Sequence, residues 1–227
     1  MPGADPRAMS HSWLFTGPPG SGRSLAAIDF AAALMCTDPE EPGCGRCEAC
    51  RAVLETKQHT DLVLVDPQEV IIPVDTVREV IGRAASLPTV APWRVVIFNN
   101  ADRLNNNGAN ALLKTVEEPP ARTVIIMCAP SDAPEDFSQT LRSRCRHLYI
   151  PSPSVESITA QLVSEGASDH DAHLAALTSL RHVGRARRLV TDPAVQKRRA
   201  VAINLAEEVF HGSQGFQAVT SLLKLVD

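Results

Sequence analysis

Five short runs of mostly apolar, often β-branched residues recur along the first two thirds of the chain. They read "SWLFTG", "DLVLVDP", "RVVIFNN", "TVIIMCAP" and "RHLYIP". Longer stretches that read as helices or loops separate them, and this alternation is typical of a parallel α/β sheet. Runs without a polar alternate face are expected for strands that helices cover on both sides. We therefore predict one domain over residues 12–150, built on a parallel five-stranded sheet.

The last third of the chain has a different pattern. Beyond "PSPS" at residues 151–154 the strand-like runs stop. Segments such as "VESITAQLVSEG" and "KRRAVAINLAEEVF" carry apolar residues three and four positions apart, as amphipathic helices do. We predict a domain boundary near Ile150 and a small all-helical domain over residues 151–227.

The composition excludes several classes of protein. With 44% hydrophobic and 21% charged residues in 227, the chain is neither disordered nor fibrous in character. The opening "MPGADPRAMSHSW" has one basic residue and no apolar segment after it, and no apolar run approaches about eighteen residues. We expect a cytoplasmic protein that does not contact membranes. The net charge of -4 argues against general coating of nucleic acid.

A glycine-rich segment, "GPPGSGRS", follows the first apolar run. Gly17, Gly22 and Ser24 fit the phosphate-loop pattern G-x-x-x-x-G-K-[ST], with Gly20 between them and Arg23 where lysine is expected. Glycines let the backbone turn its N–H groups inward, and the following helix presents its positive end to the same anion. Arginine is longer and planar, so it does not simply replace a compact ammonium at the phosphates. Binding of ATP or ADP stays open, and an ordinary Gly/Pro turn is the alternative.

The run "RVVIFNN" ends where nucleotide-hydrolysing proteins place acids that hold magnesium and orient water. Here those positions are Asn99 and Asn100. An amide carries no charge, so it neither binds magnesium strongly nor accepts a proton near neutral pH. Asp102 comes too late to replace them, and we expect it to cap the following helix, "RLNNNGANALLKTVEE". The frame of a hydrolytic site is predicted without its chemistry.

Four cysteines lie close together in "CTDPEEPGCGRCEAC". Cys36, Cys44, Cys47 and Cys50 give the spacing C-x7-C-x2-C-x2-C, which aims four thiolates at one tetrahedral centre. Four sulfurs leave no position for a catalytic water, so a zinc ion here would be structural. A disulfide pair or an iron–sulfur cluster are the alternatives. Two further cysteines, at positions 128 and 145, are expected to be packing residues.

The phosphate-loop segment, the four cysteines, "ANALLKTVEEPP" and "LRSRCR" occur together in this order. The combination resembles the clamp-loader branch of the AAA+ superfamily, in particular the bacterial DNA polymerase III subunits of the delta-prime and gamma/tau type. The resemblance is strongest over residues 12–150. It implies an AAA+-type P-loop domain with a zinc module at residues 36–50 and a helical lid domain at 151–227. The family's helical collar domain has no counterpart in this sequence, and the opening residues are too few for the family's two N-terminal helices.

Within that family, gamma/tau subunits keep the lysine and the acids, whereas delta-prime subunits combine degraded nucleotide motifs with an intact "SRC". Arg23, Asn99 and Asn100 therefore favour the delta-prime type. The resemblance also implies that Arg144 of "SRC" is an arginine finger, which stabilises the transferring phosphoryl group of ATP on a neighbouring subunit. Without it, Arg144 would be one surface cation among the arginines of "RSRCR".

Two sensor positions of the family are less well aligned here. Sensor one corresponds to Ser131, in the loop after "TVIIMC", and sensor two corresponds to Arg185 or, one residue earlier, Gly184. Segment 181–199 carries seven Lys or Arg residues against one Asp, at positions Arg181, Arg185, Arg187, Arg188, Lys197, Arg198 and Arg199. These cations would meet DNA phosphates without reading sequence, or they form a solvated helix face.

Three functional hypotheses follow from the sequence. The leading one is a non-hydrolysing, delta-prime-like clamp-loader subunit that works in DNA replication with gamma/tau and delta, and through them with a sliding clamp on primed DNA. The alternative is an active gamma/tau-like ATPase in which Arg23 and Asp102 replace the missing groups. A free-standing zinc module that binds nucleic acid is the third, although few basic or aromatic residues surround "GRCEAC".

Overall fold

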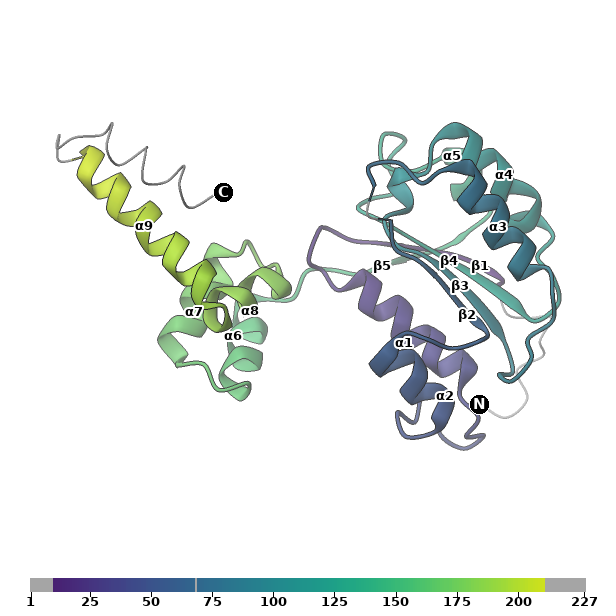
Figure 1. The fold of residues 1–227 in the computed structure, drawn as a ribbon, viewed down its shortest axis with the longest axis horizontal. Coiled ribbons are helices and arrows are strands. Elements are labelled where there is room, and N and C mark those ends of the chain that lie inside the picture. Colours follow the sequence, from purple (N-terminus) through teal and green to yellow (C-terminus); the bar gives the residue numbers. More distant parts are fainter. Residues whose placement is uncertain (1–9, 68, 211–227) are drawn as a thin grey trace. The chain divides into compact units, whose positions relative to one another are not determined.

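The computed structural model describes residues 10–67 and 69–210, with side chains up to residue 204 (Figure 1). The chain divides into two compact units that meet between Pro151 and Ser152, and each is described by itself. Within the described ranges, no helix is long and apolar enough to cross a membrane.

The first unit is built on a parallel five-stranded sheet, as the five apolar runs predict. The strand order is β2-β3-β4-β1-β5, and every neighbouring pair is parallel. The strands are β1 (Ser12–Thr16), β2 (Leu62–Val65), β3 (Arg94–Phe98), β4 (Thr123–Ala129) and β5 (Arg146–Tyr149). Strand β1 therefore lies between β4 and β5, and Thr16 at its end pairs with Ala129 on one side and Tyr149 on the other.

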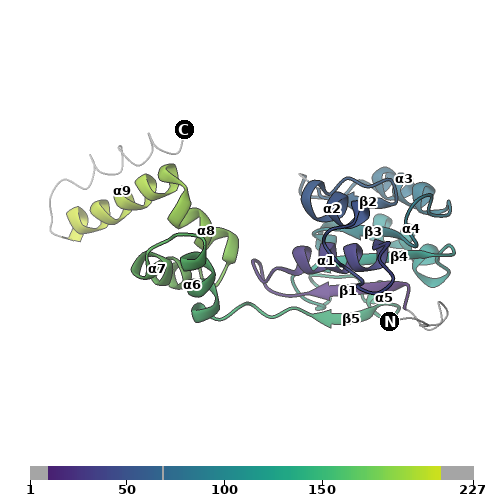
Figure 2. The same ribbon diagram turned by 90° about the horizontal axis from the view of Figure 1, so that it is seen from below.

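Helices cover both faces of this sheet (Figures 1 and 2). On one face lie α1 (Arg23–Met35), α2 (Glu48–Arg51) and a π-helical turn (Ala52–Thr56); on the other lie α3 (Val74–Ala84), α4 (Asn106–Glu117) and α5 (Gln139–Arg142), with a short 3-10 turn at Ala101–Arg103. Two buried clusters separate these layers from the sheet, because the strands alternate their apolar side chains between the faces. Phe15 packs against α1, and its neighbour Leu14 packs on the opposite side.

Strand β5 departs from the predicted burial. Strands β3 and β4 are buried along their whole length, whereas three of the four residues of β5 are exposed. The run "RHLYIP" forms a strand, but it lies at the edge of the sheet, where only β1 pairs with it. Charged residues on an edge strand discourage pairing with other chains, which accounts for Arg146 and its polar neighbour His147.

A buried ion pair fixes the edge of the sheet at which β2 and β3 begin. Asp61, fully buried, accepts a 2.9 Å hydrogen bond from Nη2 of Arg94 and also bonds to three successive backbone N–H groups, those of residues 89–91. Arg94 in turn donates to the carbonyl oxygens of Arg83 and Ser86. Burial would raise the pKa of Asp61, but these N–H donors and the guanidinium hold that pKa well below its ordinary value.

In its described residues the second unit contains helices joined by short turns and no strand, as predicted. Its helices are α6 (Val155–Ser164), α7 (Asp169–Thr178), α8 (Val183–Thr191) and α9 (Pro193–Phe210). Ser154 and Ser168 cap α6 and α7 with their hydroxyl oxygens, and apolar side chains of the first three helices form a small core of their own. The predicted helical domain also included residues 211–227, which lie outside the described part of the chain.

Candidate functional site

The glycine-rich segment forms a tight loop between β1 and α1. Gly20 and Gly22 have φ angles of 86° and 91°, which side-chain-bearing residues rarely adopt, and Gly22 is the N-cap of α1. A Cβ atom on Gly17 would overlap the carbonyl oxygen of Ile150. Three glycines are therefore required by the backbone, and the loop keeps the strand–loop–helix arrangement of a phosphate loop.

Arg23 is turned back onto this loop. Its Nη1 donates a 2.6 Å hydrogen bond to the carbonyl oxygen of Gly17, and its Nη2 lies 3.5 Å from Oδ1 of Asn100. The cation thus binds the chain's own oxygens at the position where a phosphate-loop lysine reaches an anion. Two buried polar atoms at this position, Nε of Arg23 and Oγ of Ser21, have no hydrogen-bond partner in the described structure.

The two asparagines lie directly after β3, as the sequence predicts. The N–H of Asn99 donates to the carbonyl oxygen of Val65, and its side-chain amide lies 3.5 Å from a carboxylate oxygen of Asp66. Asn100 has a φ of 52° and begins the 3-10 turn. Neither side chain brings the negative charge that a magnesium ion requires.

The expectation that Asp102 caps the following helix is wrong. Asp102 lies inside the 3-10 turn with its side chain exposed, and helix α4 begins only at Asn106. Asn105 is the N-cap, with Oδ1 accepting a 2.8 Å hydrogen bond from the N–H of Gly108. The segment "ADRLNNN" offers several capping residues, and the 3-10 turn moves the N-cap of the helix three residues beyond Asp102, to Asn105.

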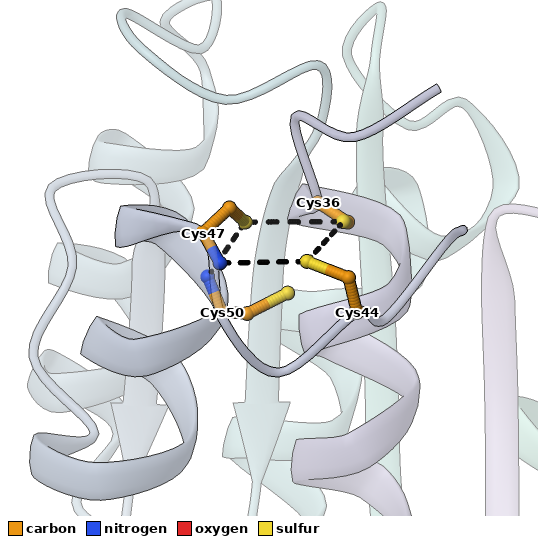
Figure 3. A group of neighbouring side chains, drawn as sticks. All are labelled: Cys36, Cys44, Cys47 and Cys50. Carbon is orange, nitrogen blue, oxygen red and sulfur yellow. Dashed lines mark hydrogen bonds between the residues drawn. The ribbon is translucent and has the colours of Figure 1, made fainter. Parts of the chain in front are cut away.

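The four cysteines converge at the carboxyl end of α1 (Figure 3). All four Sγ atoms lie within 4.8 Å of one another, and Sγ of Cys36 is 3.7 Å from that of Cys44 and 3.8 Å from that of Cys47. Tetrahedral coordination with metal–sulfur bonds of about 2.3 Å places sulfurs roughly 3.8 Å apart. The donor set fits a metal ion, and none of the described cysteines is in a disulfide.

Backbone N–H groups surround these sulfurs. The N–H of Cys47 lies 3.4 Å from Sγ of Cys44, and that of Cys50 lies 3.4 Å from Sγ of Cys47. Burial opposes ionisation of Cys47, but backbone hydrogen bonds from Thr37 and Cys50 lower its pKa to about 6, whereas burial raises the pKa of Cys50 to about 12. The backbone N–H groups therefore favour the thiolate form of Cys47.

The loop that carries the cysteines is fixed to the first unit. Cys36 and Cys50 are buried against α1, and the cluster is part of the same apolar core that covers one face of the sheet. Gly43 and Gly45 have φ angles of 81° and 71°, which allow the sharp turns between the cysteines. The placement of the cysteine cluster is that of a structural centre inside the fold, since the thiols point at one another and the cluster packs with α1.

The three arginines of "RSRCR" each make different contacts. Arg142 donates to Asp132 at 3.0 Å and to Nδ1 of His147 at 3.2 Å, and Arg146 stacks over the ring of Trp13 at 5.3 Å. Arg144 forms an ion pair with Glu117 at the end of α4, and its side chain is 36% exposed. Cys145 is buried in the core, as predicted, and so is Cys128.

Arg144 and the phosphate loop lie at opposite ends of the same strand. The loop follows the last residue of β1, whereas Arg144 precedes β5, whose first residue pairs with Trp13 near the start of β1. Glu117 lies at the same end, because Oγ of Ser12 donates to the carbonyl oxygen of Val116, its neighbour. Arg144 is therefore directed away from the phosphate loop of its own chain.

The remaining sequence candidates are described by the contacts that they make within their own units. Ser131 closes its own loop, with Oγ donating to Asp136 at 2.6 Å and accepting from the N–H of Ala133. Arg185 is exposed on α8 in the second unit. In the basic segment, Arg187 makes a two-bond ion pair with Glu165. The sensor assignments stay predictions.

The sequence reading assigned no role to Glu117, although it lies in "ANALLKTVEEPP". One signal was available: an acid in the last turn of a predicted helix faces the negative end of the helix dipole, where a carboxylate is disfavoured unless a cation compensates it. Its partner is 27 positions further along the chain, which no local pattern identifies.

Comparison with known proteins agrees with this arrangement. The family described as "DNA polymerase III, delta subunit" matches residues 4–154. The delta' subunit of DNA polymerase III from Pseudomonas aeruginosa is 35% identical over 165 residues, covering 70% of this chain and 49% of that protein. The gamma/tau subunit from Mycobacterium tuberculosis is 33% identical over 166 residues, covering 71% of this chain and 28% of that protein.

Two solved structures share the fold. A DNA polymerase III gamma subunit-related protein from Thermotoga maritima superposes with a TM-score of 0.58 at 20% identity, covering 95% of this chain and 68% of that one. The RuvB Holliday junction branch migration motor of the same organism gives a TM-score of 0.51 at 15% identity, covering 96% and 63%.

Fold and site together define a P-loop domain with an AAA+-like fold, a cluster of four cysteines after α1 and two asparagines after β3. The chain belongs to the DNA polymerase III delta subunit family, and its curated relatives support the delta-prime type over gamma/tau. The resemblance and the fold class predicted from the sequence are confirmed. The chain spans about half the length of the first two delta' relatives that it matches.

Proposed function

We propose that the chain acts as a non-hydrolysing, delta-prime-like subunit of a clamp loader. In this role it supports loading of a sliding clamp onto primed DNA and presents Arg144 to ATP held by a neighbouring subunit. The partners are the gamma/tau ATPase and delta, with the sliding clamp and DNA contacted weakly or through them. One observation carries the proposal: Arg144 lies at the opposite end of β1 from its own phosphate loop, so only phosphate on another molecule is within its reach.

The chain's own loop supports the non-hydrolysing part of this proposal. Arg23 is engaged with oxygens of Gly17 and Asn100, so an incoming phosphate would have to displace it. The positions after β3 carry amides, which do not hold magnesium firmly or activate water. These features support a loop that does not turn over ATP, whether or not it binds the nucleotide.

For the cysteine centre we propose a structural zinc ion. Cys36, Cys44, Cys47 and Cys50 would supply four sulfurs, which leaves no open position for a substrate or water. The ion would hold the loop after α1 in a fixed conformation, because those residues have little apolar area of their own to bury. An iron–sulfur cluster is the alternative that metal analysis distinguishes.

The test of the main proposal is ATP hydrolysis by the cognate gamma/tau ATPase in a reconstituted complex. Replacing Arg144 with alanine should lower the rate about a thousandfold, the value of an arginine supplied in trans. Arg78→Ala is the matched control, because Arg78 is exposed and pairs only with Asp75 one turn away. Equal rates with Arg144→Ala and the wild type would contradict the proposal.

The isolated chain supplies the complementary measurement. We expect no magnesium-dependent ATP turnover above background. Turnover that Arg23→Ala abolishes would instead support the gamma/tau-like alternative, in which the chain's own loop is active.

The zinc proposal is tested by metal analysis of protein purified under reducing conditions. Wild type should carry about one zinc per chain, Cys47→Ser should lose it, and Cys128→Ala should keep it, because Cys128 is buried in β4 away from the cluster. Iron in place of zinc, or metal retained by Cys47→Ser, would contradict it.

A further inference from the structure

We infer that Glu117 is a positioning residue for Arg144, holding the guanidinium in the orientation in which it meets a phosphate of a neighbouring subunit. This inference rests on the proposed function. It assigns a role to Glu117 of "KTVEEPP" that neither the fold nor the phosphate loop explains.

The guanidinium of Arg144 is held on part of its perimeter only. Its Nε donates to Oε1 of Glu117, and its Nη1 donates to the carbonyl oxygen of Thr140 at 2.8 Å and to Oγ of Ser143 at 3.1 Å. Its Nη2 makes no hydrogen bond to any described residue. Two nitrogens fix the plane of the group, and the third remains to donate to an external oxygen.

The backbone beneath Arg144 is also fixed. The N–H of Arg144 donates to the carbonyl oxygen of Leu141, and the N–H of Cys145 donates to that of Arg142. Leu141 and Cys145 are both buried in the same apolar cluster, on either side of the arginine in the chain. Movement of Arg144 is therefore confined to its side chain, which Glu117 then restrains.

Glu117 occupies a position where a carboxylate is unfavourable unless a cation faces it. It is the last residue of α4, where the exposed carbonyl groups form the negative end of the helix dipole. A carboxylate at that position is repelled by the helix and gains from Arg144. After Glu118, Pro119 and Pro120 stop the helix from extending past the pair.

The exposure of the Glu117–Arg144 pair favours a positioning role over a role in stabilising the fold. Glu117 is 46% exposed and Arg144 36%, so water screens their attraction and the contact contributes little to folding. An approaching phosphate can therefore share the guanidinium with Glu117. A fixed orientation before contact lowers the cost of ordering a long, flexible side chain during the reaction.

The experiment uses the reconstituted complex with the gamma/tau ATPase and compares Glu117→Ala, Glu117→Gln, Arg144→Ala and Glu118→Ala. Glu118 is the matched control, because it is the adjacent, exposed glutamate and its side chain has no partner in the described structure. We expect Glu117→Ala to lower kcat of the neighbouring ATPase about tenfold while KM for ATP stays within twofold, since misplacing a reacting group costs rate rather than affinity. Glu117→Gln keeps the acceptor oxygen without its charge and should fall between wild type and Glu117→Ala.

A second readout does not depend on the partner. In the isolated chain, the Nε–H group of Arg144 should give a slowly exchanging NMR signal that Glu117→Ala abolishes and Glu118→Ala preserves. The circular dichroism melting curve of Glu117→Ala should match that of wild type, which excludes general unfolding as the cause.

The outcomes separate the two proposals. If Arg144→Ala lowers the rate and Glu117→Ala leaves kcat unchanged or raises it, the positioning role is wrong and the finger remains. If Arg144→Ala has no effect, the proposed function fails, and the role of Glu117 fails with it. A loss of the Nε–H signal together with a lower kcat at constant KM supports both.

Discussion

The side of the sheet where the strands begin and the side where they end, here called its two edges, differ in how their polar side chains are paired. At the edge where the strands begin, Oγ of Ser12 donates to a helix carbonyl, Asp61 pairs with Arg94, and Glu117 pairs with Arg144.

At the edge where the strands end, Oγ of Ser21, Nε of Arg23 and Oδ1 of Asn99 are buried without a partner in the described structure. One atom at the first edge, Nε of Arg94, is in the same state, but the other nitrogens of that guanidinium make four bonds.

The difference distinguishes an edge whose polar side chains pair with one another from an edge whose buried polar atoms lack partners in the described structure. A buried polar atom without a partner costs roughly 1–3 kcal/mol, so a group of them is expected where side chains were arranged around a ligand rather than around each other. The phosphate loop fits this description. The opposite edge, which carries Arg144, is closed by pairs within the chain.

The largest effect that would test this comparison is expected at Asp61. Asp61→Ala removes the partner of Arg94 and the acceptor of three backbone N–H groups, and breaking such a buried pair costs about 3–5 kcal/mol. Urea unfolding of the first unit measures this cost. Asn99→Ala at the opposite edge loses one 3.5 Å contact, to Asp66, and should cost less than about 1 kcal/mol. Equal losses at the two edges would contradict the comparison.

The same pair predicts a dependence on pH. The folded state lowers the pKa of Asp61 below its ordinary value of 3.8, so its stabilising contribution is complete above that value and is lost as the pH falls through the folded pKa. The difference in free energy of unfolding between wild type and Asp61→Ala should therefore be constant from pH 5 to 7 and should shrink below pH 4. A difference that grows on acidification would show that the carboxylate is not stabilised in this way.

The strands could be predicted from the sequence because their apolar runs are short, continuous and rich in β-branched residues, which favours buried parallel strands over helices. The cysteine cluster could be predicted equally well, since two-residue spacings place Cys44, Cys47 and Cys50 close together in the chain. Both features depend on residues close together in the chain. The exposed face of β5 was missed because edge and central strands differ in their neighbours, which the run "RHLYIP" does not record.

The contacts that distinguish the two edges could not be predicted from the sequence. Asp61 and Arg94 are 33 positions apart, and Glu117 and Arg144 are 27 apart, so each pairing depends on the strand order. The wrong cap at Asp102 has a local cause, because a 3-10 turn and an α-helix accept the same capping residues and the sequence does not show which begins first. Arg23 was recognised as a substitution, but its engagement with Gly17 depends on the fold of the loop.

A smaller effect is expected at Arg23. Arg23→Lys removes the guanidinium from Gly17 and Asn100 and returns a compact ammonium to the loop, so affinity for an ATP analogue should rise about tenfold, or about 1.4 kcal/mol. Hydrolysis should stay at background, because the positions after β3 are still amides. Arg103→Lys, a change of the same kind at an arginine that donates to carbonyl oxygens of the 66–69 loop, is the control and should leave affinity unchanged. Unaltered affinity in Arg23→Lys would show that Arg23 is not what obstructs the loop.

The smallest effect compares two buried serines, one at each edge. Oγ of Ser12 donates to the carbonyl oxygen of Val116, so Ser12→Ala leaves a buried acceptor short of a donor and should destabilise the first unit by about 1 kcal/mol. Oγ of Ser21 is buried and unpartnered, so Ser21→Ala removes a desolvated hydroxyl without breaking a bond and should leave stability unchanged or raise it by up to about 1 kcal/mol. Chemical unfolding of both variants in the absence of nucleotide gives the two signs. The substitution is identical, and the two residues lie at the start of β1 and in the loop after it. A cost at Ser21 as large as that at Ser12 would mean that its hydroxyl has a partner after all, and the contrast between the edges would then rest on Arg23 and Asn99 alone.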